Sequence, residues 1–103
     1  MPLQKQQCKR FQMYIAKYPM DPYRRFRNAL ASNFGGYTEM PMSVGAWKSP
    51  DSGEVIQEGV SVFVVVLAPD RELELIALLM TYKEDADQQA VMLTSTPTDV
   101  VML

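Results

Sequence analysis

Glu58 is the residue whose type and position best fit catalysis. It comes just before a long apolar run at 60–67, so a carboxylate enters the predicted sheet at an interior strand. A carboxylate that loses part of its water becomes a better proton acceptor, which is what a general base needs. We therefore identify Glu58 as the candidate catalytic residue, with Glu39 as the second candidate base.

Aromatic side chains near these acids offer flat surfaces for a ligand. Tyr37 and Trp47 lie among glycines in the same segment, and Tyr14 projects from the first predicted strand on the face opposite Phe11. Binding pockets combine such aromatic walls with a few polar groups. The candidate ligand-binding residues are Tyr14, Tyr37, Glu39 and Trp47.

These residues also have a structural interpretation. Glu58 stands at the end of an interior strand, where an ion pair with Lys48 or an arginine would stabilise its charge. Trp47 would then be a core or interface aromatic. The burial and the partners of Glu58 distinguish the two interpretations, because an exposed, ion-paired carboxylate would exclude the catalytic role.

Composition excludes several other kinds of site. The 103 residues contain no histidine and one cysteine, Cys8. A histidine-dependent catalytic pair, an imidazole zinc site and an internal disulfide are therefore impossible. No acidic cluster has the spacing of a metal-binding loop. We expect no metal and no cofactor.

Charge is distributed unevenly along the chain. Residues 1–27 hold seven basic side chains and one acid, whereas residues 28–103 hold three basic and eleven acidic side chains. The arginines at 24, 25 and 27 would suit phosphate or nucleic-acid binding, with a steep salt dependence. Since the whole chain is acidic and base-stacking aromatics are not evident, we expect the two regions to neutralise each other. Nucleic acid is not an expected partner.

The order of patterns predicts the scaffold that positions these residues. The chain reads strand, helix, strand, strand, helix, strand, which is the split βαβ, ferredoxin-like arrangement of an α+β domain. The expected elements are strands at 9–17, 37–48, 54–67 and 88–96 and helices at 22–34 and 71–87. Pro41, which lacks an N–H for the ladder, and Gly45, which suggests a bulge or a close backbone approach, mark 37–48 as an edge strand. We expect an antiparallel sheet in the order 4-1-3-2, with two helices on one face.

Local residues set the expected helix ends and the buried face of the second helix. Asp21 and Asp70 are good N-caps, and the glycines at 35 and 36 allow a left-handed C-cap. The predicted core-facing stripe of the second helix consists of Leu73, Ile76, Ala77 and Met80.

One domain spans residues 1–103, with a flexible lead-in at 1–8 and an apolar tail at 97–103. Its interior strand is apolar on both faces at 62–67, and the helices cover only one face. A second copy is the simplest cover for the other, so a homodimer is expected. The longest apolar run has seven residues, far short of the roughly 20 that span a bilayer. Without a secretory signal at 1–10, we expect a cytoplasmic protein with no membrane partner.

Short motifs between Phe34 and Leu93, about two thirds of the chain, resemble a family of small bacterial proteins of unknown function. The motifs are Gly36-x-Thr38, Gly45-x-Trp47, Gly53, Glu58, Tyr82-Lys83 and Gln88-x-x-Val91. The family usually has an aromatic residue directly before the glutamine, where this chain has Asp87. The resemblance implies no activity, but it suggests that the residues of the 37–58 hairpin belong together.

Two functions remain from the sequence. We expect a small homodimeric module that binds a small molecule or another protein and has no catalytic activity. The alternative is a proton-transfer or isomerase-type enzyme, with Glu58 as the base and Tyr14 or Tyr37 as a hydrogen-bond donor.

Overall fold

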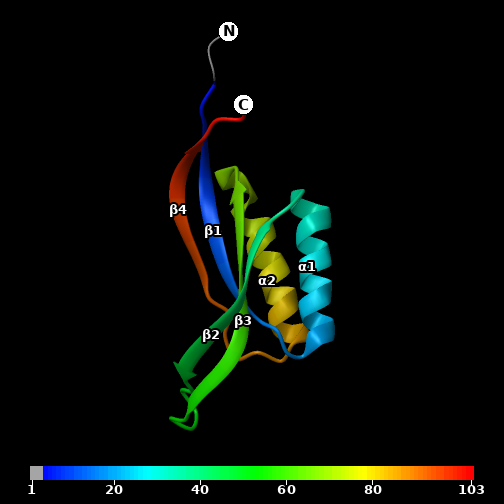
Figure 1. The fold of residues 1–103 in the computed structure, drawn as a ribbon, viewed down its shortest axis with the longest axis vertical. Coiled ribbons are helices and arrows are strands. Elements are labelled where there is room, and N and C mark those ends of the chain that lie inside the picture. The colour runs from blue at the N-terminus through cyan, green and yellow to red at the C-terminus, as the bar shows by residue number, and fades with distance from the viewer. Residues whose placement is uncertain (1–3) are drawn as a thin grey trace.

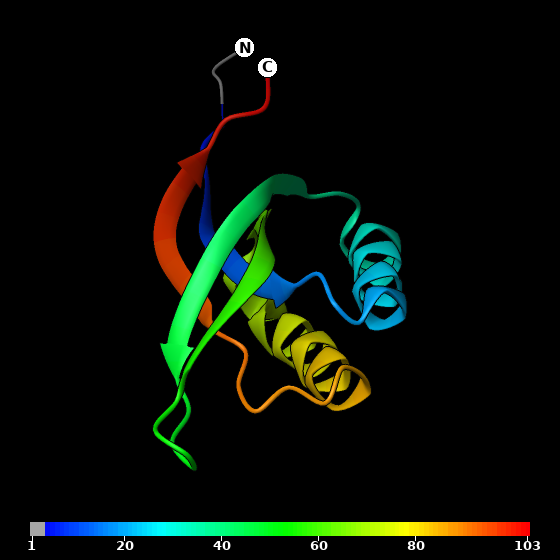
Figure 2. The same cartoon turned by 60° about the horizontal axis from the view of Figure 1, so that its bottom comes forward.

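The computed structural model describes residues 4–103, apart from the side chain of Met42. The elements are β1 (Gln6–Ala16), α1 (Met20–Phe34), β2 (Thr38–Lys48), β3 (Val55–Leu67), η1 (Pro69–Arg71), α2 (Glu72–Asp85) and β4 (Leu93–Val100). The four strands form one antiparallel sheet in the order β2-β3-β1-β4. Both helices lie on the same side of it (Figures 1 and 2). The predicted ferredoxin-like α+β fold and its strand order are confirmed.

The core lies between the helices and one face of the two central strands. Its sheet side includes Phe11, Met13, Ile15, Phe63 and Val65, and its helix side includes Tyr23, Phe26, Leu30, Leu75, Leu79 and Tyr82. Phe26 packs edge-on against Phe63, with ring centroids 5.4 Å apart. The apolar alternation of β1 and β3 thus produces the two-layer core that the sequence predicts.

The predicted buried stripe of α2 is wrong. Leu73, Ile76, Ala77 and Met80 are exposed, with Leu73 77% accessible. The helix instead buries Leu75, Leu79 and Tyr82. Apolar side chains surround almost the whole of α2, so periodicity alone does not select a face. The Tyr82 hydroxyl donates a hydrogen bond to the carbonyl of Ala16 (3.0 Å), which favours the face that carries this tyrosine.

The predicted N-caps are also wrong, whereas the C-cap of α1 is confirmed. Asp21 lies inside the first turn of α1, after an N-cap at Pro19 that makes no side-chain hydrogen bond. Asp70 lies in η1, and it does not cap α2. Both acids still stand near positive helix ends, where the dipole favours them. Gly35 ends α1 with φ +80°, and its N–H donates to the Ala31 carbonyl (3.0 Å).

The irregularity of β2 falls at Pro41 and not at Gly45, for which a bulge was one of the two predicted features. Met40 pairs with Val62, and the next pair is Ser43 with Val60, which leaves β2 one extra residue. Gly45 pairs regularly with Glu58. A proline has no N–H for the ladder, and an edge strand tolerates this loss best at a bulge.

Both chain ends differ from the predicted boundaries. β1 begins at Gln6, so the expected lead-in is wrong for residues 6–8, and Cys8 is buried. Residues 1–3 of that lead-in lie outside the described residues. β4 begins at Leu93 and not at residue 88, where the sequence predicted its start. The N–H of Gln88 bonds the carbonyl of Lys83 (2.9 Å), so Gln88 still belongs to the turn that follows α2. The predicted tail contributes residues 97–100 to β4, and residues 101–103 follow it exposed.

The sheet is longer than the helix layer that covers it. The principal extents are 58 × 25 × 24 Å, and the β2–β3 hairpin projects beyond the helices at one end (Figure 1). At the other end, Gln6 of β1 pairs with Val100 of β4. Within residues 4–103, no helix has the length and apolarity that a bilayer crossing requires.

Candidate functional site

The five predicted site residues divide between the two faces of the sheet. Tyr14, Trp47 and Glu58 line a common pocket on the face without helices. Tyr37 packs against the core on the helix side, and Glu39 bonds residues of that core. The bulge in β2 explains the division. One extra residue reverses the alternation of side chains, so Trp47 points to the opposite face from Tyr37 although both numbers are odd.

The pocket has a volume of about 260 Å³ and is built from three strands and one loop. It is lined by Tyr14, Gly45, Ala46, Trp47, Glu58, Val60, Ala90 and Met92. The N–H of Tyr14 donates to the carbonyl of Met92 (3.3 Å), which holds the loop before β4 against β1. Gly45 pairs with Glu58 and adds no side chain beside the carboxylate. Space is therefore left next to the one acid of the pocket.

Glu58 is partly buried and has no ion pair within residues 4–103. Lys48, the partner that a structural role would suggest, pairs with Val55 at the end of the hairpin. The charge of Glu58 acts on Tyr82, whose pKa rises to about 12 mainly through burial and secondly through this carboxylate. The carboxylate of Glu58 is thus available to a ligand.

Glu39 has a different environment on the helix side. It accepts hydrogen bonds from the hydroxyls of Tyr23 and Ser61, the latter at 2.8 Å. Burial raises the pKa of Tyr23, and the hydrogen bond to Glu39 raises it further, so the phenol stays protonated. Sequence reasoning missed Tyr23 and Ser61. Ser61, the one polar residue within 60–67, was the available indication that a buried hydroxyl needs a partner.

Tyr37 is an aromatic of the core. Its ring packs edge-on against Phe63, with centroids 5.1 Å apart. The structure therefore brings together three of the five predicted residues and places Tyr37 and Glu39 elsewhere.

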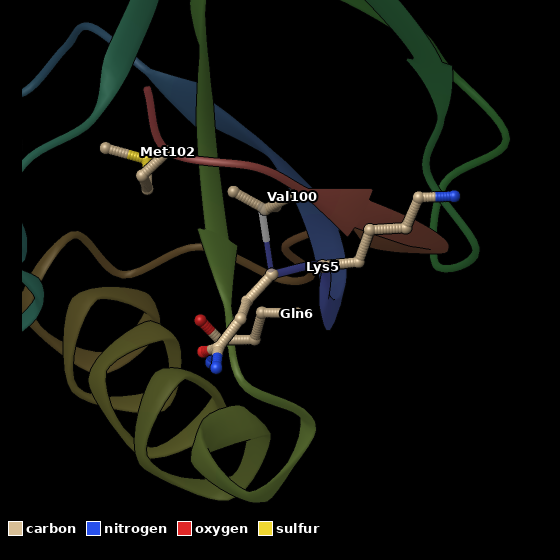
Figure 3. Close-up of a pocket in the computed structure, with 5 residues that line it drawn as sticks. Lys5, Gln6, Val100 and Met102 are labelled. Atoms are coloured by element: carbon tan, nitrogen blue, oxygen red, sulfur yellow. The ribbon is translucent and has the colours of Figure 1, made fainter. Parts of the chain in front are cut away.

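A larger, open cleft of about 450 Å³ lies at the ends of β1 and β4 (Figure 3). It is lined by Gln4, Lys5, Gln6, Val100 and Met102. The amino group of Lys5 points away from Met102 in this view, and the lining residues include no aromatic and no acidic side chain. We therefore place the candidate site at the pocket of Tyr14, Trp47 and Glu58.

Two solved structures align with this chain over nearly their whole length. A phage SAM lyase in complex with S-methyl-5'-thioadenosine has a TM-score of 0.71 and 12% identity, covering 92% of this chain and 90% of the lyase chain. CPII, a nitrogen regulatory PII-like protein from Thiomonas intermedia K12 bound to ADP, AMP and bicarbonate, has a TM-score of 0.67 and 12% identity. That alignment covers 94% of this chain and 96% of CPII. Neither a protein-family model nor a curated protein matches the chain. At 12% identity, the two structures show a shared fold and no more.

Proposed function

We propose that the protein is a small ligand-binding module whose pocket takes a flat, uncharged nucleoside of the adenosine type. The observation that carries this proposal is the convergence of Tyr14, Trp47 and Glu58, from three different strands, on one pocket. Aromatic side chains stack on a planar base. A carboxylate without a cation partner accepts the N–H groups of such a base.

The charge of the pocket favours a nucleoside over a nucleotide. Its lining includes Glu58 and no lysine or arginine. A phosphate would be repelled by the carboxylate and would find no charged donor among these residues. Val60 and Met92 add apolar surface for a ring or a thioether. That both similar structures hold adenosine-containing ligands supports the ligand class.

The module is further proposed to act as a homodimer in the bacterial cytoplasm. The sheet face opposite the helices supports the dimer, since it has no helix layer (Figure 2). The single cysteine supports a cytoplasmic location, because a chain with one cysteine has no internal disulfide, and proteins of the cytoplasm rarely have one.

Tryptophan fluorescence tests the ligand directly. Trp47 is the one tryptophan of the chain and lies in the pocket, so a bound nucleoside changes its emission. We expect a saturable change with S-methyl-5'-thioadenosine and binding at least about tenfold weaker with AMP, because Glu58 repels its phosphate. Glu58→Gln should weaken nucleoside binding by about tenfold, the cost of about one charge-assisted hydrogen bond.

Tyr37→Phe is the matched control, since Tyr37 lies on the other face and should leave the affinity unchanged. Calorimetry on the same samples measures binding without relying on the fluorophore. Absence of both a fluorescence change and heat at millimolar nucleoside would reject the proposed function.

A proton-transfer enzyme is the second candidate, favoured by the position of Glu58. The carboxylate is partly buried, lacks an ion pair within residues 4–103, and shares its pocket with Tyr14. Incubation with the nucleoside in D₂O tests this role by mass spectrometry. Deuterium at carbon positions that is lost in Glu58→Gln and kept in Tyr37→Phe would establish catalysis. Recovery of an unlabelled, unaltered nucleoside, from a protein that binds it by fluorescence and calorimetry, would reject proton transfer and leave the binding role.

A further inference from the structure

The face of the sheet without helices, called here the open face, has a regular line of side chains along β3. The line consists of Glu58, Val60, Val62, Val64 and Val66. On the neighbouring strand β1, Tyr14, Gln12 and Arg10 pair with Val62, Val64 and Val66. Val60 and Val62 are only 8% accessible, so the exposed apolar surface of this face lies at Val66 (43%) and at Met40 (42%), which pairs with Val62 from β2. Aliphatic side chains thus form the middle of the open face, and a charged residue stands near each end.

The molecule exposes more surface than a compact monomer of its size. Its accessible area is 7008 Å², whereas a monomer of 11.7 kDa exposes roughly 5,900 Å². Its radius of gyration is 15.2 Å, against about 13 Å for a compact domain of this length. The difference in area exceeds the roughly 800 Å² that one partner contributes to a stable interface. An association that covers part of this surface is therefore expected.

The sheet edges are poorly suited to that association. The outer strands β2 and β4 carry Pro41 and Pro97, and each proline removes one N–H donor from its strand. Prolines at sheet edges oppose pairing with a further strand. A partner therefore fits the open face better than either edge.

The charges of the open face are arranged for a second copy of the same chain. Arg10 stands beside Val66, and Glu58 stands at the other end of the line. Val62 lies midway, four residues from Val66 and four from Glu58, or about 13 Å along the strand in each direction. Consider a two-fold axis that passes Val62, lies between the two sheets and runs across the strands. It would place the Arg10 end of each copy against the Glu58 end of the other.

Neither charge has a partner of opposite sign inside the described part of the chain. The guanidinium of Arg10 donates a hydrogen bond to the side-chain oxygen of Gln12 (2.7 Å), and neither it nor Glu58 forms an ion pair. A charge left unpaired beside apolar surface gains most from an opposite charge across an interface.

We propose that a second copy of this chain docks face to face on the open face, about a two-fold axis at Val62, with Arg10 of each copy paired to Glu58 of the other. Met40 and Val66 then supply the apolar contacts above the buried Val62, and the charges form the rim of the interface. The inference rests on the proposed function in one respect, because it makes the nucleoside pocket a site at the boundary of two copies. The two oxygens of a carboxylate can accept from a guanidinium and from a ligand together, and the neutral pair gives the pocket no net positive charge that would attract a phosphate.

Charge reversal tests the arrangement through the mass of the particle in solution. Light scattering on the ligand-free protein should give twice 11.7 kDa for the wild type. Arg10→Glu and Glu58→Arg should each raise the dissociation constant at least about tenfold, because like charges then face each other twice. The double variant Arg10→Glu/Glu58→Arg should restore the dimer. Arg24→Glu, an exposed arginine of α1, is the control and should remain dimeric.

Each other outcome overturns the proposal. A monomeric wild type rejects the interface, a trimer rejects the two-fold axis, and single variants that dimerise normally reject the Arg10–Glu58 pair. Failure of the double variant to recover, with unchanged circular dichroism, also rejects the pair. Ligand binding is scored separately by Trp47 emission. A dimer that binds no nucleoside would reject the proposed function alone, and a monomer that binds it would reject the interface alone.

Discussion

The two candidate carboxylates, Glu39 and Glu58, differ in how many of their hydrogen-bonding sites are already used. Glu39 accepts from Tyr23 and Ser61 through one oxygen, so it satisfies hydroxyls at the margin of the core. Glu58 makes no ion pair within the described residues and lines a pocket. A carboxylate whose sites are occupied by the fold contributes to stability. One that faces a pocket remains available to a ligand.

Removal of the Glu39 carboxylate should destabilise the fold. In Glu39→Ala, the hydroxyls of Tyr23 and Ser61 retain only their mutual contact of 3.2 Å, and one buried donor loses its acceptor. We expect a loss of about 1–3 kcal/mol in the free energy of unfolding, measured by urea titration. Glu54→Ala, at an exposed position, is the control and should change stability by about 0.5 kcal/mol or less. Equal effects in the two variants would contradict the structural role.

The raised pKa of Tyr82 predicts a loss of stability at high pH. Burial, followed by the charge of Glu58, raises this pKa from 10.0 to about 12. Below pH 10 both the folded and the unfolded chain keep the proton. Above it the unfolded chain releases the proton first, so stability falls as the pH rises toward 12, by about 1–3 kcal/mol.

The comparison of Tyr82→Phe with Tyr18→Phe measures this effect in urea titrations at pH 8, 10 and 11.5. Tyr82→Phe should reduce the alkaline fall and leave the part due to Tyr23, whose pKa is also raised, whereas Tyr18→Phe, at a site 72% accessible, should keep the full fall. The idea fails if the two variants have the same pH profile.

At the scale of elements, the patterns that agree with one another were predictable from the sequence. The alternation in β1 and β3, the glycine at the end of α1 and the proline in β2 all indicate the same arrangement, and the strand order follows from them. The buried face of α2 was not predictable, because its apolar residues surround the helix. The separation of Tyr37 from Trp47 was also missed, because no sequence pattern shows that β2 gains one residue between Met40 and Ser43. One extra residue changes the face of every side chain that follows it.

The C-cap of α1 should be sensitive to substitution because of its backbone conformation. Gly35 has φ +80°, which L side chains rarely adopt, although no atom would clash with an added Cβ. Gly35→Ala should therefore cost about 1 kcal/mol through backbone strain alone, measured as a lower thermal midpoint. Gly59→Ala is the matched control, since Gly59 lies in β3 with open space around it and without a positive φ. A stabilising effect of Gly35→Ala would refute this account.

At the scale of the whole molecule, the sheet carries both proposed sites, and the helices cover its other face. One face packs the core, and the other carries both the pocket and the line of side chains centred on Val62. If both proposals hold, dimerisation and nucleoside binding share Glu58, so each changes the equilibrium of the other by the same factor. The sequence predicted an uncovered face. Alternation already placed Tyr14 on that face, but it did not place Trp47 there, because the bulge in β2 decides the face of Trp47.

The pairing of Gln6 with Val100 has a consequence for engineering the chain. The start of β1 and the end of β4 lie side by side, far from the β2–β3 turn (Figure 1). A short glycine-rich linker between these two strands would join them, and new termini could then be opened at the exposed turn of residues 50–52. Such a circular permutant would present its ends at the turn of the β2–β3 hairpin, whose strands carry Trp47 and Glu58. A fluorescent domain fused there would convert ligand binding into an optical readout without altering the core.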